Sequence, residues 1–208
     1  DLDADKKRCE NTGAALIFNP EPKEMYKDGF CSFVDMTGPT KELCGKSRPI
    51  HFRGVCTVVN KLFNIVGPDK AYFGQKDAQQ LAVIKRMVLD LNIPIEIVGC
   101  PIIREEDGLA KSSRNTYLNE QERRSALILS KTIFMGEKMV REGQRDVKTL
   151  VDAMKKNIET EPLAKIDYVE VVDFSNIQKI DKISGSVLVA MAVYIGKTRL
   201  IDNFIINI

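Results

Sequence analysis

The feature that most constrains the fold is an alternation of amphipathic and apolar stretches over residues 51–103. Apolar residues recur at helical spacing in FRGVCTVVNKLFNIVG, which ends at Gly67 and Pro68. The short run KAYFG separates it from a second helical stretch, DAQQLAVIKRMVLDLN, and the β-branched run IPIEIVGCPII follows. AALIF (14–18) is an earlier buried-strand candidate. Strands alternating with helices predict a parallel sheet, and the last run is typical of a strand covered on both faces.

The pattern changes after residue 103. A loop over 104–118 leads into a long charged amphipathic helix, a second helix and then strands, the last two forming a hairpin that turns at IGKT. Helices followed by strands are typical of a separate α+β unit. We therefore expect an α/β chain with two domains: residues 1–103 belong to a parallel-sheet domain, and residues 104–208 form a smaller α+β C-terminal domain.

Composition argues against several classes of partner. The chain has 31 basic and 29 acidic residues, and a net charge of +2 gives no electrostatic reason to expect binding to nucleic acid or to a membrane surface. We find no apolar run of membrane-spanning length and expect no signal peptide. Five cysteines without CxxC spacing favour a reducing cytoplasm over a disulfide framework or a zinc site.

Two loops that follow predicted strands carry residues suited to bind an anion. GQKDAQQ places Lys76 and Asp77 at the start of a helix, where backbone amides favour negative charge. Asp77 and Gln80 also have the spacing of a capping box, which would explain the aspartate without a ligand. GLAKSSRN (108–115) follows the next strand, and taken alone it reads as a solvated basic loop.

The parallel sheet changes the interpretation of the second loop. Loops at the carboxyl ends of parallel strands lie at the same edge, so the two loops are expected to meet there. Lys76, Lys111 and Arg114 would supply positive charge at this edge, and Ser112 and Ser113 would supply hydroxyl donors. Such a set suits a polyphosphate, which lysine binds as a point charge and arginine binds in a bidentate manner.

Other motifs are weaker. CGKS and IGKT resemble the end of a P-loop, but Thr40 and Met191 stand where the motif requires its first glycine. His51 is the only histidine, so histidine metal clusters and a Ser-His-Asp triad are not expected. At the start of a helix His51 is interpreted as structural, with a supporting ligand contact, together with Arg48, as the alternative.

The segment from SRPIHFRGV to DGLAKSSRN resembles the pantothenate synthetase family, with FGQKDAQQ and DGLAKSSRN as its most specific motifs. The likeness is dense over residues 1–118 and looser beyond. It implies a Rossmann-like domain of the class I nucleotidyltransferase type, a C-terminal lid and a homodimer in the cytoplasm. It also implies pantothenate biosynthesis: ATP-dependent condensation of pantoate with β-alanine through pantoyl adenylate, releasing AMP and pyrophosphate, with Mg²⁺ accompanying ATP.

The resemblance also implies roles for individual residues. Lys76, Ser112, Ser113 and Arg114 are the implied catalytic residues, and Gln80 is the implied pantoate ligand. The implied ATP-binding residues are Gly74, Gln75, Lys76, Asp77, Ile103, Lys111, Ser112, Ser113 and Arg114. Ile103 would contact adenine through its backbone, and the family often has methionine where Lys111 stands.

The sequence departs from the family in one respect. The family's HxGH phosphate-binding motif and an early glutamine for pantoate are both missing, so we expect a truncated chain that is impaired or inactive alone. Two alternatives stay open: another nucleotidyltransferase that stops at the nucleotide adduct, and a non-enzymatic module that dimerises or binds nucleotide without turnover. Consumption of β-alanine would distinguish the ligase from the first, and pyrophosphate release would distinguish it from the second.

Overall fold

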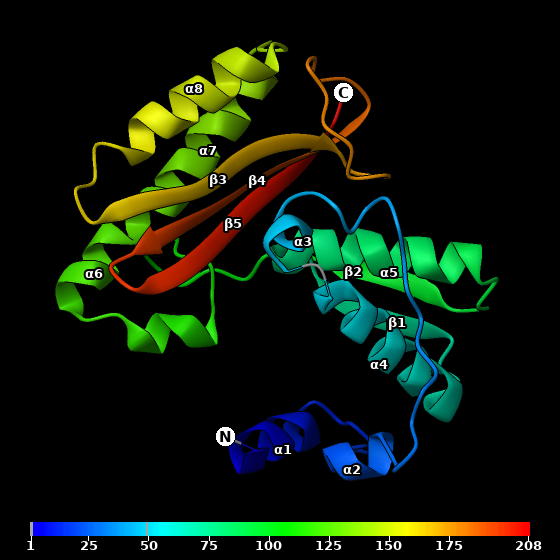
Figure 1. Ribbon diagram of the computed structural model, residues 1–208. Helices are drawn as coiled ribbons and strands as arrows, with labels where there is room; N and C mark the ends of the chain where they lie inside the picture. The colour runs from blue at the N-terminus through cyan, green and yellow to red at the C-terminus, as the bar shows by residue number, and fades with distance from the viewer. Residues whose placement is uncertain (1, 49) are drawn as a thin grey trace. The chain divides into compact units, whose positions relative to one another are not determined.

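A computed structural model describes residues 2–48 and 50–208, and the chain forms two compact units, Asp1–Ser32 and Phe33–Ile208 (Figure 1). The first unit contains α1 (Leu2–Asn11) and the short α2 (Pro22–Met25). Acidic residues occupy the first turn of α1 and a basic residue its last turn, which matches the helix dipole. No residue of α1 is buried, so this helix depends on such local interactions.

The run AALIF does not form the predicted buried strand. Its backbone is irregular and Leu16 is 77% exposed. A strand is stable when its N–H and C=O groups pair with a neighbouring strand, and no strand among the described residues pairs with this run. Apolar composition alone was therefore an insufficient signal here.

The second unit confirms the predicted alternation of helices and strands. After the short α3 (Cys44–Ser47), the elements are α4 (His51–Val66), β1 (Lys70–Gly74), the 3₁₀ turn η1 (Gln75–Asp77), α5 (Ala78–Asp90) and β2 (Glu96–Cys100). Gly67 ends α4 in the left-handed region, with φ of 58°, as its stop signal predicts. β1 and β2 pair in parallel, so the loops after Gly74 and Cys100 leave from the same edge.

This parallel sheet is covered on one face. Helices α4 and α5 pack there around Phe52, Phe63 and Ile84, and Ala71 and Phe73 of β1 contact the same cluster. Tyr72 of β1 points to the other side and is 64% exposed. The run IPIEIVGCPII was expected to form a strand covered on both faces, but within the described residues one layer of helices packs against this sheet and no residue of β2 is buried.

The remaining elements form an α+β arrangement. In chain order they are η2 (Ser113–Tyr117), α6 (Glu120–Ser125), α7 (Leu127–Arg141), α8 (Val147–Ile158), β3 (Ala164–Asp173), β4 (Ser186–Ile195) and β5 (Thr198–Asn207). The predicted long helix is interrupted at Ala126, where α6 ends and α7 begins. The three strands form an antiparallel sheet in the order β3-β4-β5, and β4 and β5 form the expected hairpin around Gly196.

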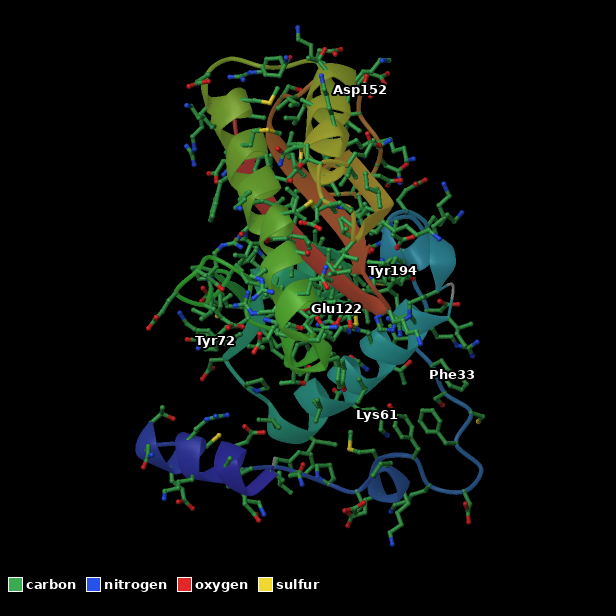
Figure 2. All side chains as sticks on the ribbon, turned by 90° about the vertical axis from the view of Figure 1, so that its left-hand side faces the viewer. Phe33, Lys61, Tyr72, Glu122, Asp152 and Tyr194 are labelled. Carbon is green, nitrogen blue, oxygen red and sulfur yellow. The ribbon has the colours of Figure 1, made fainter. Side chains whose placement is uncertain are left out.

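The antiparallel sheet is buried on both faces by different partners. One face packs against α7 and α8 around Leu150, Met154 and Phe204 (Figure 2). The other face, which includes Leu188, packs against Ala78 and Ala82 of α5. The second contact brings the sheet against the start of α5 and thereby places β5 beside the loop that follows β1. Both sheets lie in one compact unit, and the division at residue 103 stays a proposal.

Candidate functional site

A solvent-connected pocket lies between the start of α5 and the adjacent face of β4 and β5. The start of α4 and the α3 segment form its remaining wall, through Arg48, His51 and Leu43. Lys76, Asp77 and Gln80 line it from the η1–α5 side, and Arg199, Ile201 and Asn203 line it from β5. The pocket therefore draws on segments that are far apart in the sequence.

The structure brings two of the predicted phosphate-binding cations together. Lys76 from the loop after β1 and Arg114 from η2 line this pocket, and both also line a smaller adjoining pocket. Ser112 lines the adjoining pocket, where its hydroxyl accepts a hydrogen bond from the Arg114 N–H at 3.2 Å. Because β1 and β2 are parallel, the loops that follow them meet at this edge.

Other predicted site residues lie elsewhere. Lys111 lines a separate surface pocket with Glu105, Glu106 and Asp107. Ile103 is 66% exposed, and Ser113 is exposed at the start of η2. Gly74 and Gln75 end β1 and begin η1, beside the pocket residues but not among those that line it. The roles of these residues in ATP binding stay predictions.

The pocket is rich in positive charge. Arg199 and Asp202 line it, but each forms an ion pair with a residue outside the lining. Arg48, Lys76 and Arg114 also line it, against the single carboxylate of Asp77. Burial, and secondarily the Arg48 charge, lowers the pKa of His51 below its usual value, and Asp77 opposes this shift. A concave site with this excess of cations attracts a multiply charged anion.

The predicted capping box at the start of α5 is wrong. Asp77 occupies the N-cap position, but its side chain makes no capping hydrogen bond. Its backbone angles, φ −96° and ψ 58°, differ from the extended geometry that an N-cap residue normally adopts, because the preceding η1 turn leads directly into the helix. Asp77 is among the residues that line the pocket.

Gln79 was missed by sequence reasoning and has a structural function. Its side chain is 6% exposed, and its Nε2 donates to the carbonyl oxygens of Pro39 at 2.9 Å and Glu42 at 2.7 Å. Its Oε1 accepts from the backbone N–H of Cys44 at 3.0 Å. One buried amide therefore fixes the segment that leads into α3 and forms a wall of the pocket.

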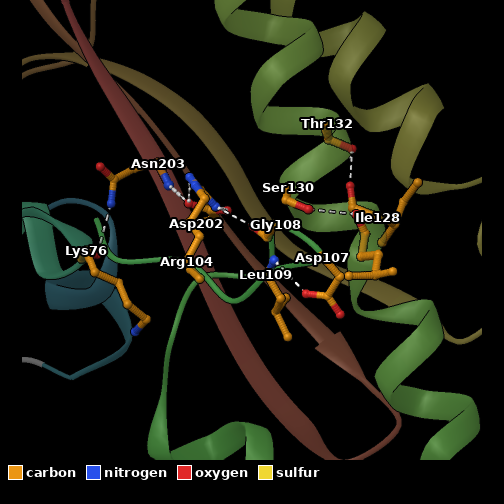
Figure 3. A network of polar contacts seen from close by, with 12 residues as sticks. Lys76, Arg104, Asp107, Gly108, Leu109, Ile128, Ser130, Thr132, Asp202 and Asn203 are labelled. Carbon is orange, nitrogen blue, oxygen red and sulfur yellow. Dashed lines mark hydrogen bonds and ion pairs between the residues drawn. The ribbon is translucent and has the colours of Figure 1, made fainter. Parts of the chain in front are cut away.

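Two polar residues of β5, Asp202 and Asn203, were also missed (Figure 3). Asp202 is 1% exposed and forms a bidentate ion pair with Arg104, at 2.7 and 3.0 Å. Asn203 is 4% exposed and donates to the backbone carbonyl oxygens of Gln75 at 3.1 Å and Lys76 at 2.9 Å. The available signal was two adjacent polar residues in the otherwise apolar run LIDNFII.

Arg199 is a further pocket residue that the sequence did not indicate. Its guanidinium pairs with Asp167 on β3, at 2.9 Å from Nε and 2.8 Å from Nη2, and lies near the ring of Tyr168. Tyr168 is largely buried with its hydroxyl 3.5 Å from the Cys44 sulfur, and burial raises the pKa of the phenol. The phenol therefore stays protonated and serves as a neutral part of the wall.

The stem of the GLAKSSRN loop is held by its own polar network. Asn115 donates to Glu105 at 2.7 Å and to the carbonyl oxygen of Ala110 at 3.1 Å. The Asn115 bond lowers the pKa of Glu105, and a hydrogen bond from Arg123 lowers the pKa of Asp107. The two carboxylates and Arg123 form ion pairs at 3.1 and 2.6 Å. This network fixes the loop from which η2 starts, and thereby the position of Arg114 within η2.

Within residues 2–48 and 50–208, no group of three or more histidine, cysteine or acidic residues is arranged to hold a metal ion. Over the same residues, no helix is both long and apolar enough to cross a membrane.

A parallel β-α-β unit with an anion-suited pocket at the carboxyl ends of its strands places the chain among the α/β proteins that bind ligands at this edge of the sheet. The family model for pantoate-beta-alanine ligase matches residues 1–205, and the chain belongs to that family. It is 65% identical to the pantothenate synthetase of Ruminiclostridium cellulolyticum over 204 residues, which are 98% of this chain and 73% of that protein.

Solved structures agree with this assignment. The pantothenate synthetase of Thermus thermophilus superposes with a TM-score of 0.92 at 38% identity, over 98% of this chain and 74% of that one. A pantoate-beta-alanine ligase from Francisella tularensis, solved in complex with a β,γ-ATP compound and β-alanine, superposes with a TM-score of 0.71 at 32% identity, over 98% of this chain and 69% of that one.

Proposed function

We propose that this chain condenses pantoate with β-alanine in an ATP-dependent ligation that yields pantothenate. The observation that carries the proposal is that Lys76 and Arg114, from two different loops, line one cationic pocket in a chain of the pantoate-beta-alanine ligase family. A site that holds a carboxylate and a triphosphate together needs convergent positive charge. This pocket supplies it at the edge of the sheet where such ligands bind.

The proposed reaction has two steps. A carboxylate oxygen of pantoate attacks the α-phosphorus of ATP, and the bond to the β-phosphate oxygen breaks, so that pyrophosphate leaves. The β-alanine amine then attacks the acyl carbon, a C–N bond forms, the bond to AMP breaks and the amine loses a proton. Both steps depend on orienting two anions and compensating their charge more than on covalent help from side chains.

The proposed roles follow the placement of the side chains. Lys76 and Arg114 bind phosphate oxygens, and Gln80, which lines the pocket one helical position after the structural Gln79, binds pantoate. Ser112 lines the adjoining pocket, and its hydroxyl donates a hydrogen bond to the substrate. Further ATP contacts are proposed for Gly74, Gln75, Asp77, Ile103, Lys111 and Ser113. The proposed catalytic residues are Lys76, Ser112, Ser113 and Arg114.

Magnesium fits this site through ATP itself. Mg²⁺ usually keeps several waters and is held by substrate phosphates with one or two carboxylates. Asp77 lines the pocket and its carboxylate makes no capping bond, whereas Asp202 is committed to Arg104. Asp77 is therefore the residue that would hold the ion, which would neutralise phosphate charge. We further propose a homodimer in the cytoplasm, with residues 104–208 acting as a lid over residues 1–103.

The test is pantoate-dependent release of pyrophosphate from ATP by this chain, with and without β-alanine. The outcome that supports the proposal is release that depends on pantoate, at whatever rate the chain retains, with pantothenate formed only when β-alanine is added. Lys76→Ala is expected to lower the rate by about 100-fold, since it removes a charge-assisted contact in the transition state. The matched control is Lys85→Ala, an exposed lysine on the helix that follows the Lys76 loop.

Each alternative has its own outcome in this assay. Pyrophosphate release without consumption of β-alanine favours a nucleotidyltransferase that stops at the adduct. ATP binding that Lys76→Ala weakens, without any pyrophosphate release, favours a nucleotide-binding module. An equal rate in the Lys76→Ala and Lys85→Ala variants contradicts the proposed site.

A further inference from the structure

Two consecutive residues of β5 contact two different loops. Adjacent residues in a strand point to opposite faces of the sheet, so Asp202 and Asn203 face away from each other. Asp202 lies on the face that packs against α7, where Phe204 and Leu200 are its neighbours in the pleat. Asn203 lies on the face that packs against the start of α5, beside the pocket. Both side chains are at least 96% buried.

Asn203 holds the loop that carries Lys76. Both amide hydrogens of its side chain are used, one on the Gln75 carbonyl oxygen at 3.1 Å and one on the Lys76 carbonyl oxygen at 2.9 Å. Two donors on two successive carbonyl groups fix the orientation of the amide and the path of the backbone. The position of the Lys76 Cα, and hence the reach of its amine, is set by this contact (Figure 3).

Asp202 holds the loop that leads to Arg114. It accepts two hydrogen bonds from Arg104, which in turn donates to the Gly108 carbonyl oxygen at 3.1 Å. The Arg104 guanidinium also lies 4.9 Å from the centre of the Phe134 ring on α7. Gly108 is the first residue of the GLAKSSRN segment. Arg104 therefore links Asp202 to the turn from which this segment starts.

The chemistry of these two residues is unusual for a buried strand. A buried ion pair adds little net stability compared with apolar residues of similar volume, because desolvation offsets the attraction. The neighbouring positions of β5, Leu200, Phe204 and Ile206, are apolar and buried. An aspartate and an asparagine among these apolar residues are better explained by the two loops that their hydrogen bonds fix than by packing.

We propose that Asp202 and Asn203 are positioning residues of the ligation site, which hold the Lys76 loop and the Gly108 loop in place so that Lys76 and Arg114 face one pocket. The catalytic consequence rests on the proposed function, whereas the positioning can be measured without turnover. A displacement of about 1 Å in a reacting group can lower kcat by about 100-fold.

The test uses two near-isosteric variants and two matched controls. Asn203→Asp turns a donor into an acceptor that faces two carbonyl oxygens, and Asp202→Asn removes the charge that pairs with Arg104. Asn207→Asp, at the exposed end of the same strand, and Asp152→Asn, at an exposed position of α8, make the same chemical changes elsewhere. Each chain is compared by amide hydrogen exchange and by kcat for pantoate-dependent pyrophosphate release.

The two variants are expected to give opposite local patterns. Asn203→Asp should accelerate exchange at residues 76–80 by about tenfold or more and leave residues 105–111 unchanged, and Asp202→Asn should do the reverse. Both should lower kcat by at least about tenfold. Both should also lower the melting temperature relative to the exposed controls, because each leaves buried polar groups without their partners. Exchange is therefore measured well below the melting temperature of each variant, where a local pattern distinguishes positioning from general destabilisation.

Two outcomes would overturn the proposal. In one, exchange in each loop is the same in the variant as in its control. In the other, exchange accelerates uniformly across β3, β4 and β5, which would make both residues merely structural. If the unmodified chain releases no pyrophosphate, that result counts against the proposed function of the chain, and the exchange pattern still decides whether these residues position the loops.

Discussion

The Oε1 atom of Gln79 accepts a hydrogen bond from the backbone N–H of Cys44 at 3.0 Å, and this contact joins α5 to the segment before α4. Gln80, the next residue, lines the pocket. Two adjacent glutamines on one helix therefore have different roles. Gln79 fixes the segment before α4 by hydrogen bonds, and Gln80 is proposed to bind a substrate.

Replacing each glutamine separates these tasks. Gln79→Ala removes three hydrogen bonds and takes away the acceptor of the Cys44 N–H and the side-chain donor of the Pro39 carbonyl oxygen, whereas the Glu42 carbonyl oxygen still accepts from the Gly45 N–H. We therefore expect a loss of about 2–3 kcal/mol in the free energy of unfolding. Gln80→Ala is expected to change it by less than about 0.5 kcal/mol and to raise the KM for pantoate. Urea denaturation and steady-state kinetics measure both, and a reversed pattern would exchange the two assignments.

The only histidine reports directly on the electrostatics of the pocket. Burial and the Arg48 charge lower the pKa of His51, so its NMR titration midpoint is expected below about 6.5. Arg48→Ala should raise the midpoint without restoring it fully, because burial is the larger cause. Asp77→Asn should lower it further. A midpoint above 6.5 in the unmodified chain would contradict the positive field proposed for this pocket.

The same shift gives stability a pH dependence of known sign. A lowered pKa means that the folded state binds a proton less readily than the unfolded state, so the contribution of His51 to stability is fully present above about 6.5. It is lost as the pH falls through the lowered folded-state pKa. Urea denaturation at several pH values should therefore show a steeper loss of stability with acid than His51→Gln does.

Substitution by alanine is expected to lower the stability of the fold at Gly108 and to raise it at Gly54. Gly108 has φ of 92°, and an added Cβ would meet only ordinary contacts, the nearest being Ser130 Oγ at 3.6 Å. The expected loss of about 1–2 kcal/mol in Gly108→Ala therefore comes from backbone strain. Gly54 lies exposed inside α4 with open space around it, and Gly54→Ala should stabilise the fold by about 0.5–1 kcal/mol. Thermal unfolding of both variants checks the pair.

Cysteine reactivity should follow burial. Cys56 is fully buried, and burial raises its thiol pKa to about 11, whereas Cys31 is exposed. At pH 8 a thiol reagent is expected to modify Cys31 readily and Cys56 only after denaturant is added. Because the folded-state pKa is raised, the stability contributed by Cys56 is lost as the pH rises from about 9 towards 11. Mass spectrometry of the alkylated peptides gives the order of labelling.

The parts of the fold that local pattern determines could be predicted from the sequence. Helical spacing located α4 and α5, and the parallel pairing of β1 with β2 followed from the alternation itself. AALIF shows the limit, because a strand depends on a partner that its own residues do not specify. The covering of a sheet face is likewise a property of the elements around it and not of the run IPIEIVGCPII.

The residues of the site also include some that the sequence could predict and some that it could not. Lys76 and Arg114 were predicted to meet because the carboxyl ends of parallel strands share an edge, and both line the pocket. Gln79, Asp202 and Asn203 were missed because their partners are distant in the sequence and have no fixed spacing from them. The capping box at Asp77 had the correct spacing and failed on backbone geometry, which spacing does not encode.

The hairpin that turns at Gly196 has a consequence for how the pocket is assembled. A slip of one residue in the pairing of β4 with β5 would turn Asp202 towards α5 and Asn203 towards α7, and both loops would lose their anchor. β5 also follows every element that it holds in chain order. During synthesis, the loops that carry Lys76 and Arg114 are therefore made before β5 and gain their fixed positions only when its hairpin with β4 closes in the correct register.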